Sequence, residues 1–179
     1  MLPFDKINVW YDVKLQSCTL QNPNKVYPVQ TLKAVPPSPG LSDGWCNTAL
    51  VIESDLAESS SLEGHASVQV HFIIQPVQPH NVPDTHVAYV HYFMPVTMTR
   101  DGANHVPIAE PALKMFCFKR HLRSNKTVKG GIIPLTDIWQ VVQLIPKFDG
   151  QADRTLTSEN CLAKAKQFYL NPFSEDQVF

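Results

Sequence analysis

The sequence predicts a single, mainly β domain spanning residues 1–179, a partly closed barrel or strongly bent antiparallel sheet with one C-terminal helix. Its 15 prolines against 7 glycines disfavour long helices, because proline interrupts a helix interior. Short segments rich in β-branched and aromatic residues alternate with turn-forming clusters. A chain of this length can form one substantial core, since such a domain buries roughly 70 % of the surface that its unfolded chain exposes.

About seven or eight segments have the composition of strands, and clusters of proline, glycine and aspartate separate them. In chain order these segments are 7–13, 25–35, 48–53, 65–74, 86–97, 113–120, 132–135 and 138–145. The proline-rich stretches 36–40 and 75–85 and the acidic stretch 54–64 are expected to be loops.

Two of the expected strands differ in their hydrophobic pattern. From His65 to Ile74 apolar residues occupy alternate positions, so this strand is expected to bury one face and to leave the other, with His65 and His71, in water. In segment 86–97 apolar residues occur at both parities. That strand is therefore expected to be central and covered on both faces.

A helix is expected over residues 158–170. Thr157 is a suitable N-cap, and Leu162, Ala165, Phe168 and Tyr169 form an apolar stripe at helical spacing. Pro172 would stop the helix. A further aromatic group is expected either to join the last strand to this helix or to form a peptide-binding cage: Trp139, Phe148, Phe168 and Tyr169.

Positive charge is concentrated in one segment, although the formal net charge of the chain is −1. Six basic residues and no acidic ones occur between Pro111 and Gly130: Lys114, Lys119, Arg120, Arg123, Lys126 and Lys129. A basic hairpin of this kind can contact several phosphates, and the candidate contacts are Lys119, Arg120, Arg123, Lys126 and Lys129. The alternative is a solvated hairpin whose lysines discourage edge pairing, and charge runs are more often solubility features than binding sites.

No catalytic or metal-binding signature is present. The four cysteines are scattered without a CxxC pair, and Cys117 is expected to be a buried structural thiol. By parity His65 and His71 share a face, whereas His86 and His91 do not, so three converging ligands cannot be named. We therefore expect no catalytic residue, no metal and no cofactor, and a protein that is not an enzyme; the alternative is a metal-dependent enzyme that uses His71 or His91.

The sequence also restricts the expected location. It shows no basic segment followed by an apolar signal region, and no run of about 18 apolar residues. We expect a nuclear or cytoplasmic protein without membrane contact.

Three motifs in the last third of the chain carry a family resemblance: Ile133-Pro134-Leu135 with Ile138, Leu144-Ile145-Pro146-Lys147-Phe148, and Ala165 to Asn171. Together they resemble the C-terminal segment of proteins encoded by DNA transposons of basidiomycete fungi, of the Plavaka and Kyakuja-Dileera-Zisupton type. The ribonuclease-H-like core of such proteins has no counterpart here, so the resemblance implies a detached accessory domain or a degraded mobile-element fragment.

The strand order is also similar to the bromo-adjacent-homology class at the level of the fold, which implies a link to chromatin by analogy alone. The leading hypothesis is a non-enzymatic module that binds DNA or chromatin through the basic hairpin. The alternative is a protein-interaction or structural domain that binds a peptide at an exposed sheet edge or an aromatic groove.

Overall fold

The computed structural model describes residues 6–16, 26, 28–42, 44–53, 64–77, 86–100, 104–107, 109–110, 115–148, 150–151 and 153–171. Cys18 and Lys114 lie outside these ranges. The strands run in chain order: β1 (Lys6–Trp10), β2 (Asp12–Leu15), β3 (Gln30–Val35), β4 (Trp45–Cys46), β5 (Thr48–Ile52), β6 (His65–Val77), β7 (Val87–Pro95), β8 (Thr97–Arg100), β9 (Asn104–Pro107), β10 (Ala109–Glu110), β11 (Met115–Arg120), β12 (Gly130–Pro134), β13 (Ile138–Pro146) and β14 (Phe168–Asn171). Two short helices accompany them in the described ranges: the 3-10 helix η1 (Leu135–Asp137) and the α-helix α1 (Cys161–Lys164).

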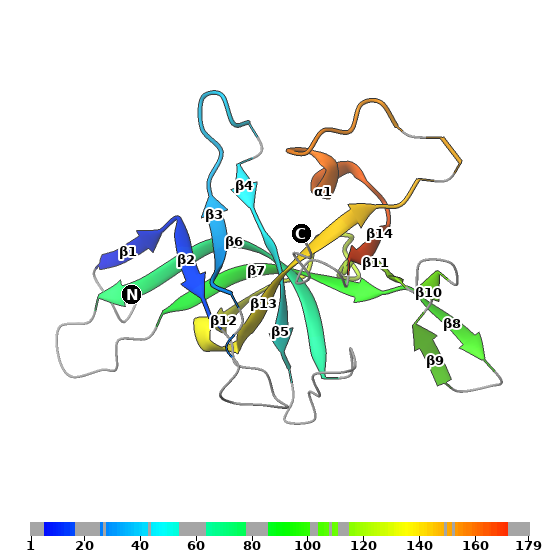
Figure 1. The fold of residues 1–179 in the computed structure, drawn as a ribbon, viewed down its shortest axis with the longest axis horizontal. Coiled ribbons are helices and arrows are strands. Elements are labelled where there is room, and N and C mark those ends of the chain that lie inside the picture. The colour runs from blue at the N-terminus through cyan, green and yellow to red at the C-terminus, as the bar shows by residue number, and fades with distance from the viewer. Residues whose placement is uncertain are drawn as a thin grey trace.

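The prediction of a mainly β, partly closed antiparallel structure is confirmed. Nine strands form one sheet in the order β1-β6-β5-β13-β14-β11-β7-β12, with β10 attached to β11. Strands β6 and β7 also pair with each other, so the path β6-β5-β13-β14-β11-β7 bends back on itself into a partial ring. The far ends of β6 and β7, flanked by β1 and β12, project beyond this ring (Figure 1).

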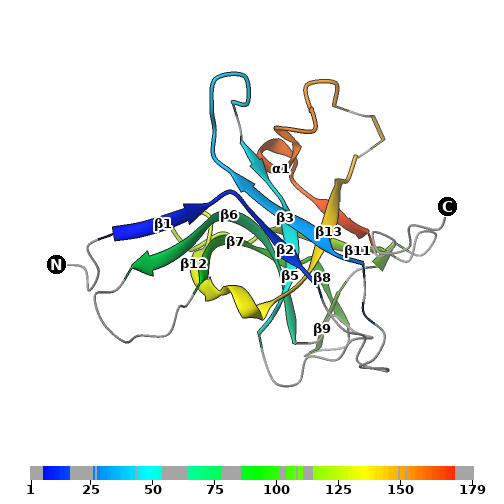
Figure 2. The ribbon, with the colours of Figure 1, turned by 60° about the vertical axis from the view of Figure 1, so that its left-hand side comes forward.

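The described residues form fourteen strands, more than the seven or eight that the sequence predicted, and one reason is that a predicted strand changes partners along its length. Segment 7–13 divides at Tyr11 into β1, which pairs with β6, and β2, which pairs with β3. Strands β2, β3 and β4 form a separate small sheet. Figures 1 and 2 both show the β3–β4 connection and the segment before α1 on the same side of the molecule.

Two hydrophobic clusters occupy the two faces of the large sheet. One lies between the sheet and strand β3, and includes Leu32, Val68, Val90 and Ile138. The other consists of side chains from the strands of the ring: Leu50, Phe93, Phe118, Val142, Leu144, Phe168 and Leu170. Strand β7 pairs with β6, β11 and β12, so its predicted central position is confirmed.

The prediction that one face of strand β6 lies in water is wrong. Ser67 is fully buried and Gln69 is 8 % exposed, since this face lies opposite Leu50 and Phe93 in the ring. A β-bulge between Val70 and Phe72 then shifts the register. As a result Ile73 is buried and Phe72 is 43 % exposed, the reverse of what simple alternation predicts.

The predicted helix over residues 158–170 is wrong in extent. The predicted N-cap is also wrong, because the helix begins after Asn160, and the Thr157 hydroxyl accepts from the Asn160 amide at 3.3 Å in the turn before the helix. Helix α1 spans four residues, and Ala165 is already extended with φ −66° and ψ 144°. Residues 168–171 become β14, which pairs with β13 on one side and β11 on the other. The tertiary gain from completing the sheet outweighs the helical propensity of this segment.

The remaining structural predictions have mixed outcomes. Cys117 is buried, as expected, and its thiol donates to Gln167 Oε1 at 3.6 Å; Cys46 and Cys161 form no disulfide. Phe168 joins strand to strand instead of strand to helix, and meets Phe93 edge-to-face at 5.4 Å. Phe148 is 44 % exposed and outside this contact. Within the described ranges, no helix is long and apolar enough to cross a bilayer.

Candidate functional site

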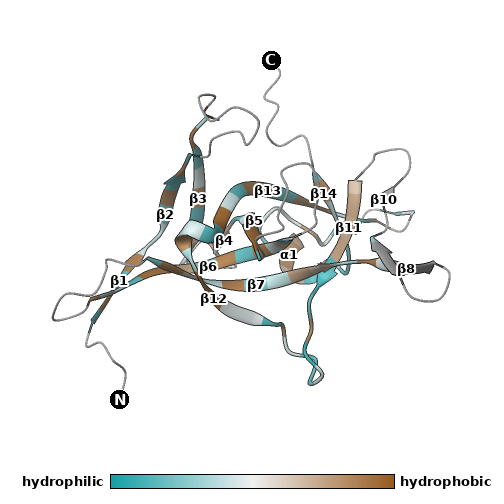
Figure 3. Cartoon of the chain, turned by 90° about the horizontal axis from the view of Figure 1, so that it is seen from below, coloured by the Kyte–Doolittle hydropathy of each residue, from teal (hydrophilic) through white to brown (hydrophobic). Residues whose placement is uncertain are grey.

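Residues 121–129 of the basic segment form a small hairpin that leaves the sheet between β11 and β12. Both of these strands pair with β7, and Tyr92 lies at the interruption between them. The Tyr92 amide donates to the Lys129 carbonyl at 2.9 Å, and the His121 amide donates to the Tyr92 carbonyl at 2.9 Å. The hairpin is thus anchored to the central strand, and Figure 3 shows this hydrophilic loop extending away from the sheet.

Hydrogen bonds fix the conformation of the hairpin tip. The Arg123 amide donates to the Thr127 carbonyl at 2.8 Å, and the Lys126 amide donates to the Arg123 carbonyl at 2.9 Å. The Asn125 side chain accepts from both the amide and the hydroxyl of Thr127, at 3.1 and 2.6 Å. Lys126 adopts a left-handed conformation with φ 64°. The tip is therefore a defined turn, which lowers the entropy cost of binding through its side chains.

Four of the five predicted phosphate contacts are accessible to solvent. Lys119, Arg123 and Lys126 are exposed, and Lys129 is half-buried with its ammonium 5.0 Å from the centre of the Tyr92 ring. Strand alternation places Lys119 on the same face of the sheet as Tyr92, since Lys119 pairs with Met94. Arg123 and Lys126 form the tip, so the cations follow the hairpin from its base to its end.

Arg120 is the exception among the predicted phosphate contacts, because its side chain is engaged within the protein. Its guanidinium is directed into the ring, where Nε donates to the Leu162 carbonyl at 2.9 Å and Nη2 contacts the same oxygen. Nη2 also donates to Gln69 Oε1 at 3.2 Å, and the guanidinium carbon lies 5.3 Å from the centre of the Phe93 ring. Burial lowers the pKa of Arg120 from its usual value. Arg120 therefore attaches α1 to the sheet.

A cluster of aromatic and histidine side chains lies beside the hairpin, and the sequence did not predict it. The rings of His71 and His91 are 4.0 Å apart between centroids, and Tyr89 Oη is 3.3 Å from His91 Nε2. The Phe72 ring lies 6.2 Å from the Tyr89 ring. The bulge in β6 brings His71 toward His91, and no local sequence signal specifies such a bulge.

This cluster does not supply a recognisable metal site. In the described part of the chain, no group of three or more histidine, cysteine or acidic side chains is placed to hold a metal ion. The Nε2 atom of His71 is buried and has no hydrogen-bond partner. Burial, His91 and Arg120 together lower the pKa of His71 from 6.5 to about 4, and burial lowers the pKa of His91. Both rings are consequently neutral at pH 7.

The stability of the domain should decrease in acid because of His71. Its pKa is lower in the folded state than in the unfolded state, so between pH 6.5 and about 4 the unfolded chain binds more protons. After allowing for its partial exposure, we expect a loss on the order of 1–2 kcal/mol across this window. His71→Gln should reduce the slope of unfolding free energy against pH, measured by urea unfolding at several pH values. An unchanged slope in this variant would contradict the assignment.

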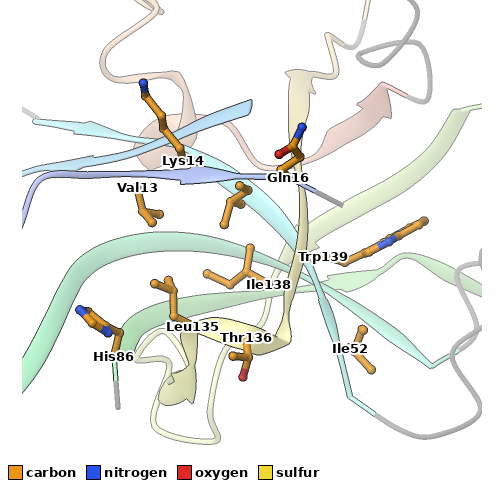
Figure 4. A pocket seen from close by; sticks show the side chains of 10 residues that line it. Val13, Lys14, Gln16, Ile52, His86, Leu135, Thr136, Ile138 and Trp139 are labelled. Atoms are coloured by element: carbon orange, nitrogen blue, oxygen red, sulfur yellow. The ribbon is translucent and has the colours of Figure 1, made fainter. Parts of the chain in front are cut away.

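Two depressions lie elsewhere on the surface. One, of about 520 Å³, is lined by ten residues between β2 and η1, and Figure 4 shows Val13, Leu135 and Ile138 converging in it. The other, of about 490 Å³, lies between β4, β13 and α1 and includes Cys46, Cys161 and Gln69. Burial raises the pKa of the Cys46 thiol, which opposes a role as a nucleophile.

The comparisons with known proteins identify a family without assigning a function. A family model described as "Domain of unknown function (DUF6830)" matches residues 1–110. The chain belongs to this family. No curated protein and no solved structure matches the chain.

The DUF6830 match covers strands β1 to β10, and the basic hairpin lies beyond it. The two parts nevertheless interleave in one sheet, because β12 pairs with β7 and β13 pairs with β5. The likeness to transposon proteins involves the last third of the chain, which the family model does not cover, and it stays a prediction, as does the bromo-adjacent-homology likeness.

Proposed function

We propose that this chain is a non-enzymatic accessory module of a transposon-derived protein, and that its basic hairpin contacts the phosphates of nucleic acid. One observation carries the proposal: residues 121–129 form an anchored, projecting turn whose charged side chains are all lysines or arginines. The turn contains no aspartate or glutamate. Lys119 adds a further exposed cation at the base. Cations on a projecting loop can approach a phosphate backbone without a preformed cleft.

The proposal predicts modest affinity with a strong dependence on salt. Each phosphate neutralised by a lysine or arginine releases condensed counterions. Contacts from Lys119, Arg123, Lys126 and Lys129 would give a slope of log K against log salt on the order of −2 to −4. With a net charge of −1, the chain should show this affinity at the hairpin and little elsewhere.

The test is fluorescence anisotropy of a labelled DNA duplex across a salt series. The double variant Arg123→Glu, Lys126→Glu should weaken binding at low salt by roughly tenfold or more and should lower the salt slope by about 2. The matched control is Arg154→Glu, Lys166→Glu, which reverses two exposed cations away from the hairpin. The control should bind as the parent chain does.

A second variant separates binding from folding. Lys126→Gly removes one cation and also relieves the positive φ of that position, so its thermal stability should equal or exceed that of the parent chain while its affinity decreases. Equal losses in the hairpin and control variants would contradict the hairpin as the site. Absence of binding at low salt would overturn the proposal and favour a protein partner.

A further inference from the structure

The sheet next to the hairpin carries an exposed face that we call the aromatic face: Phe72, Tyr89, Ile132, His71 and His91. The register places Phe72, Tyr89 and Ile132 directly beside one another on β6, β7 and β12. Phe72 is 43 % exposed and Ile132 is 67 % exposed, and Tyr89 lies half-buried between them. Side chains opposite one another in adjacent strands lie on the same side of a sheet, so these three form one continuous row.

The aromatic face carries no charge at pH 7, because its two histidines are neutral. Strands β6, β7 and β12 contain no aspartate, glutamate, lysine or arginine. Gly130, which pairs with His91, leaves space for the Tyr89 ring, because a Cβ at Gly130 would lie 2.5 Å from Tyr89 Oη. Tyr89 therefore extends over the backbone at the base of the hairpin.

Cations border the aromatic face at this end. Arg123 Nη2 donates to the Gly130 carbonyl at 3.2 Å, which holds its guanidinium at the edge of β12. Strand β12 has no further strand beyond it in the described sheet, so this edge is open. The positive field of Arg120 also reaches the face, since it is one of the causes that lower the pKa of His71 and His91.

We propose that the aromatic face binds single-stranded nucleic acid, with unpaired bases stacked on Phe72 and Tyr89 and the phosphates beside Arg123 and Lys126. This inference rests on the proposed function and names its substrate class. The bordering positive charge fits an anionic polymer, and the exposed rings fit unpaired bases, whose faces a duplex conceals. Stacking on aromatic side chains tolerates any base, so no sequence preference is expected.

The experiment compares labelled oligo-thymidine and oligo-uridine single strands with a matched duplex in the same anisotropy assay. Single strands should bind at least tenfold more tightly than the duplex. Phe72→Ala should weaken single-strand binding by roughly five- to hundredfold, the range for loss of one stacked base, and should leave duplex binding unchanged. Phe148→Ala is the matched control, because Phe148 is 44 % exposed and lies elsewhere. It should change neither.

Two further measurements separate stacking from folding. Phe72→Trp should restore single-strand affinity, and a strand containing 2-aminopurine should lose fluorescence on binding to the parent chain and not to Phe72→Ala. One outcome would overturn the aromatic face as the binding site and leave the hairpin proposal intact. In that outcome duplex binds as tightly as single strand, Phe72→Ala has no effect, and Arg123→Glu, Lys126→Glu weakens binding of both. Binding to neither strand form overturns both proposals and leaves a protein partner for this face.

Discussion

Phe168→Ala should destabilise the domain by about 3–5 kcal/mol, the range for removing a fully buried phenylalanine ring. Phe168 is completely buried, packs edge-to-face on Phe93 and belongs to the cluster formed by the strands of the ring. It also lies on β14, which joins β13 to β11. A cavity at this position would weaken the strand that links two parts of the sheet. Urea unfolding followed by circular dichroism measures the loss.

Two companion variants make the result specific. Phe168→Leu keeps most of the buried volume and should cost less than about 1.5 kcal/mol. Phe148→Ala removes the same atoms from an exposed position and should change the free energy of unfolding by no more than about 0.5 kcal/mol. If Phe168→Ala were no more destabilising than Phe148→Ala, β14 would not be an integral strand of the sheet.

The same segment shows why part of the fold could not be predicted from the sequence. Leu162, Ala165, Phe168 and Tyr169 have helical spacing, and Thr157 is a suitable N-cap residue for a helix that starts at residue 158. Those signals are local, whereas the strand conformation of residues 168–171 depends on pairing with β13 and β11, distant in the chain. The fold class was predictable because strand composition and proline content are local properties. The part that β14 takes in closing the sheet was not.

Closure also determines which polar residues are buried. His65, Ser67 and Gln69 alternate with apolar residues, which is typical of a strand with one face in water. In the structure the ring covers part of this face, and Ser67 Oγ has no hydrogen-bond partner. The bulge after Val70 then shifts the register, so His71 and Phe72 lie near other residues of β7 than a regular strand would place beside them.

The candidate site was predicted in outline by its charge. Residues 121–129 of the cationic segment form a projecting hairpin, and Arg123 and Lys126 occupy its tip. Alternation along β11 distinguishes Arg120 from Lys119, which a count of charges does not. Phe118 and Arg120 lie on one face of the strand, and Lys119 lies on the other. Phe118 is buried, so its neighbour on that face is directed inward as well. The aromatic face required the register of three strands, which the sequence does not provide.

Arg120→Ala should cost about 2–3 kcal/mol of stability and should leave the salt dependence of nucleic-acid binding unchanged. Hydrogen bonds from a charged group contribute roughly 1.5–3 kcal/mol, and this variant removes those to the Leu162 carbonyl and Gln69. Arg120→Lys should restore only part of the loss, because an ammonium lacks the planar geometry that reaches both acceptors. Lys119→Ala, at the exposed neighbouring position, should change stability by no more than about 0.5 kcal/mol.

The comparison of Arg120 with Arg123 separates a structural arginine from a binding one. Arg123→Ala should leave the free energy of unfolding within about 0.5 kcal/mol of the parent value and should lower the salt slope by about 1. A double-mutant cycle between Arg120→Ala and Gln69→Ala should give a coupling of about 0.5–3 kcal/mol, since the two side chains share a hydrogen bond. If Arg120→Ala instead lowered the salt slope without loss of stability, Arg120 would be a phosphate contact and its inward position would not persist on binding.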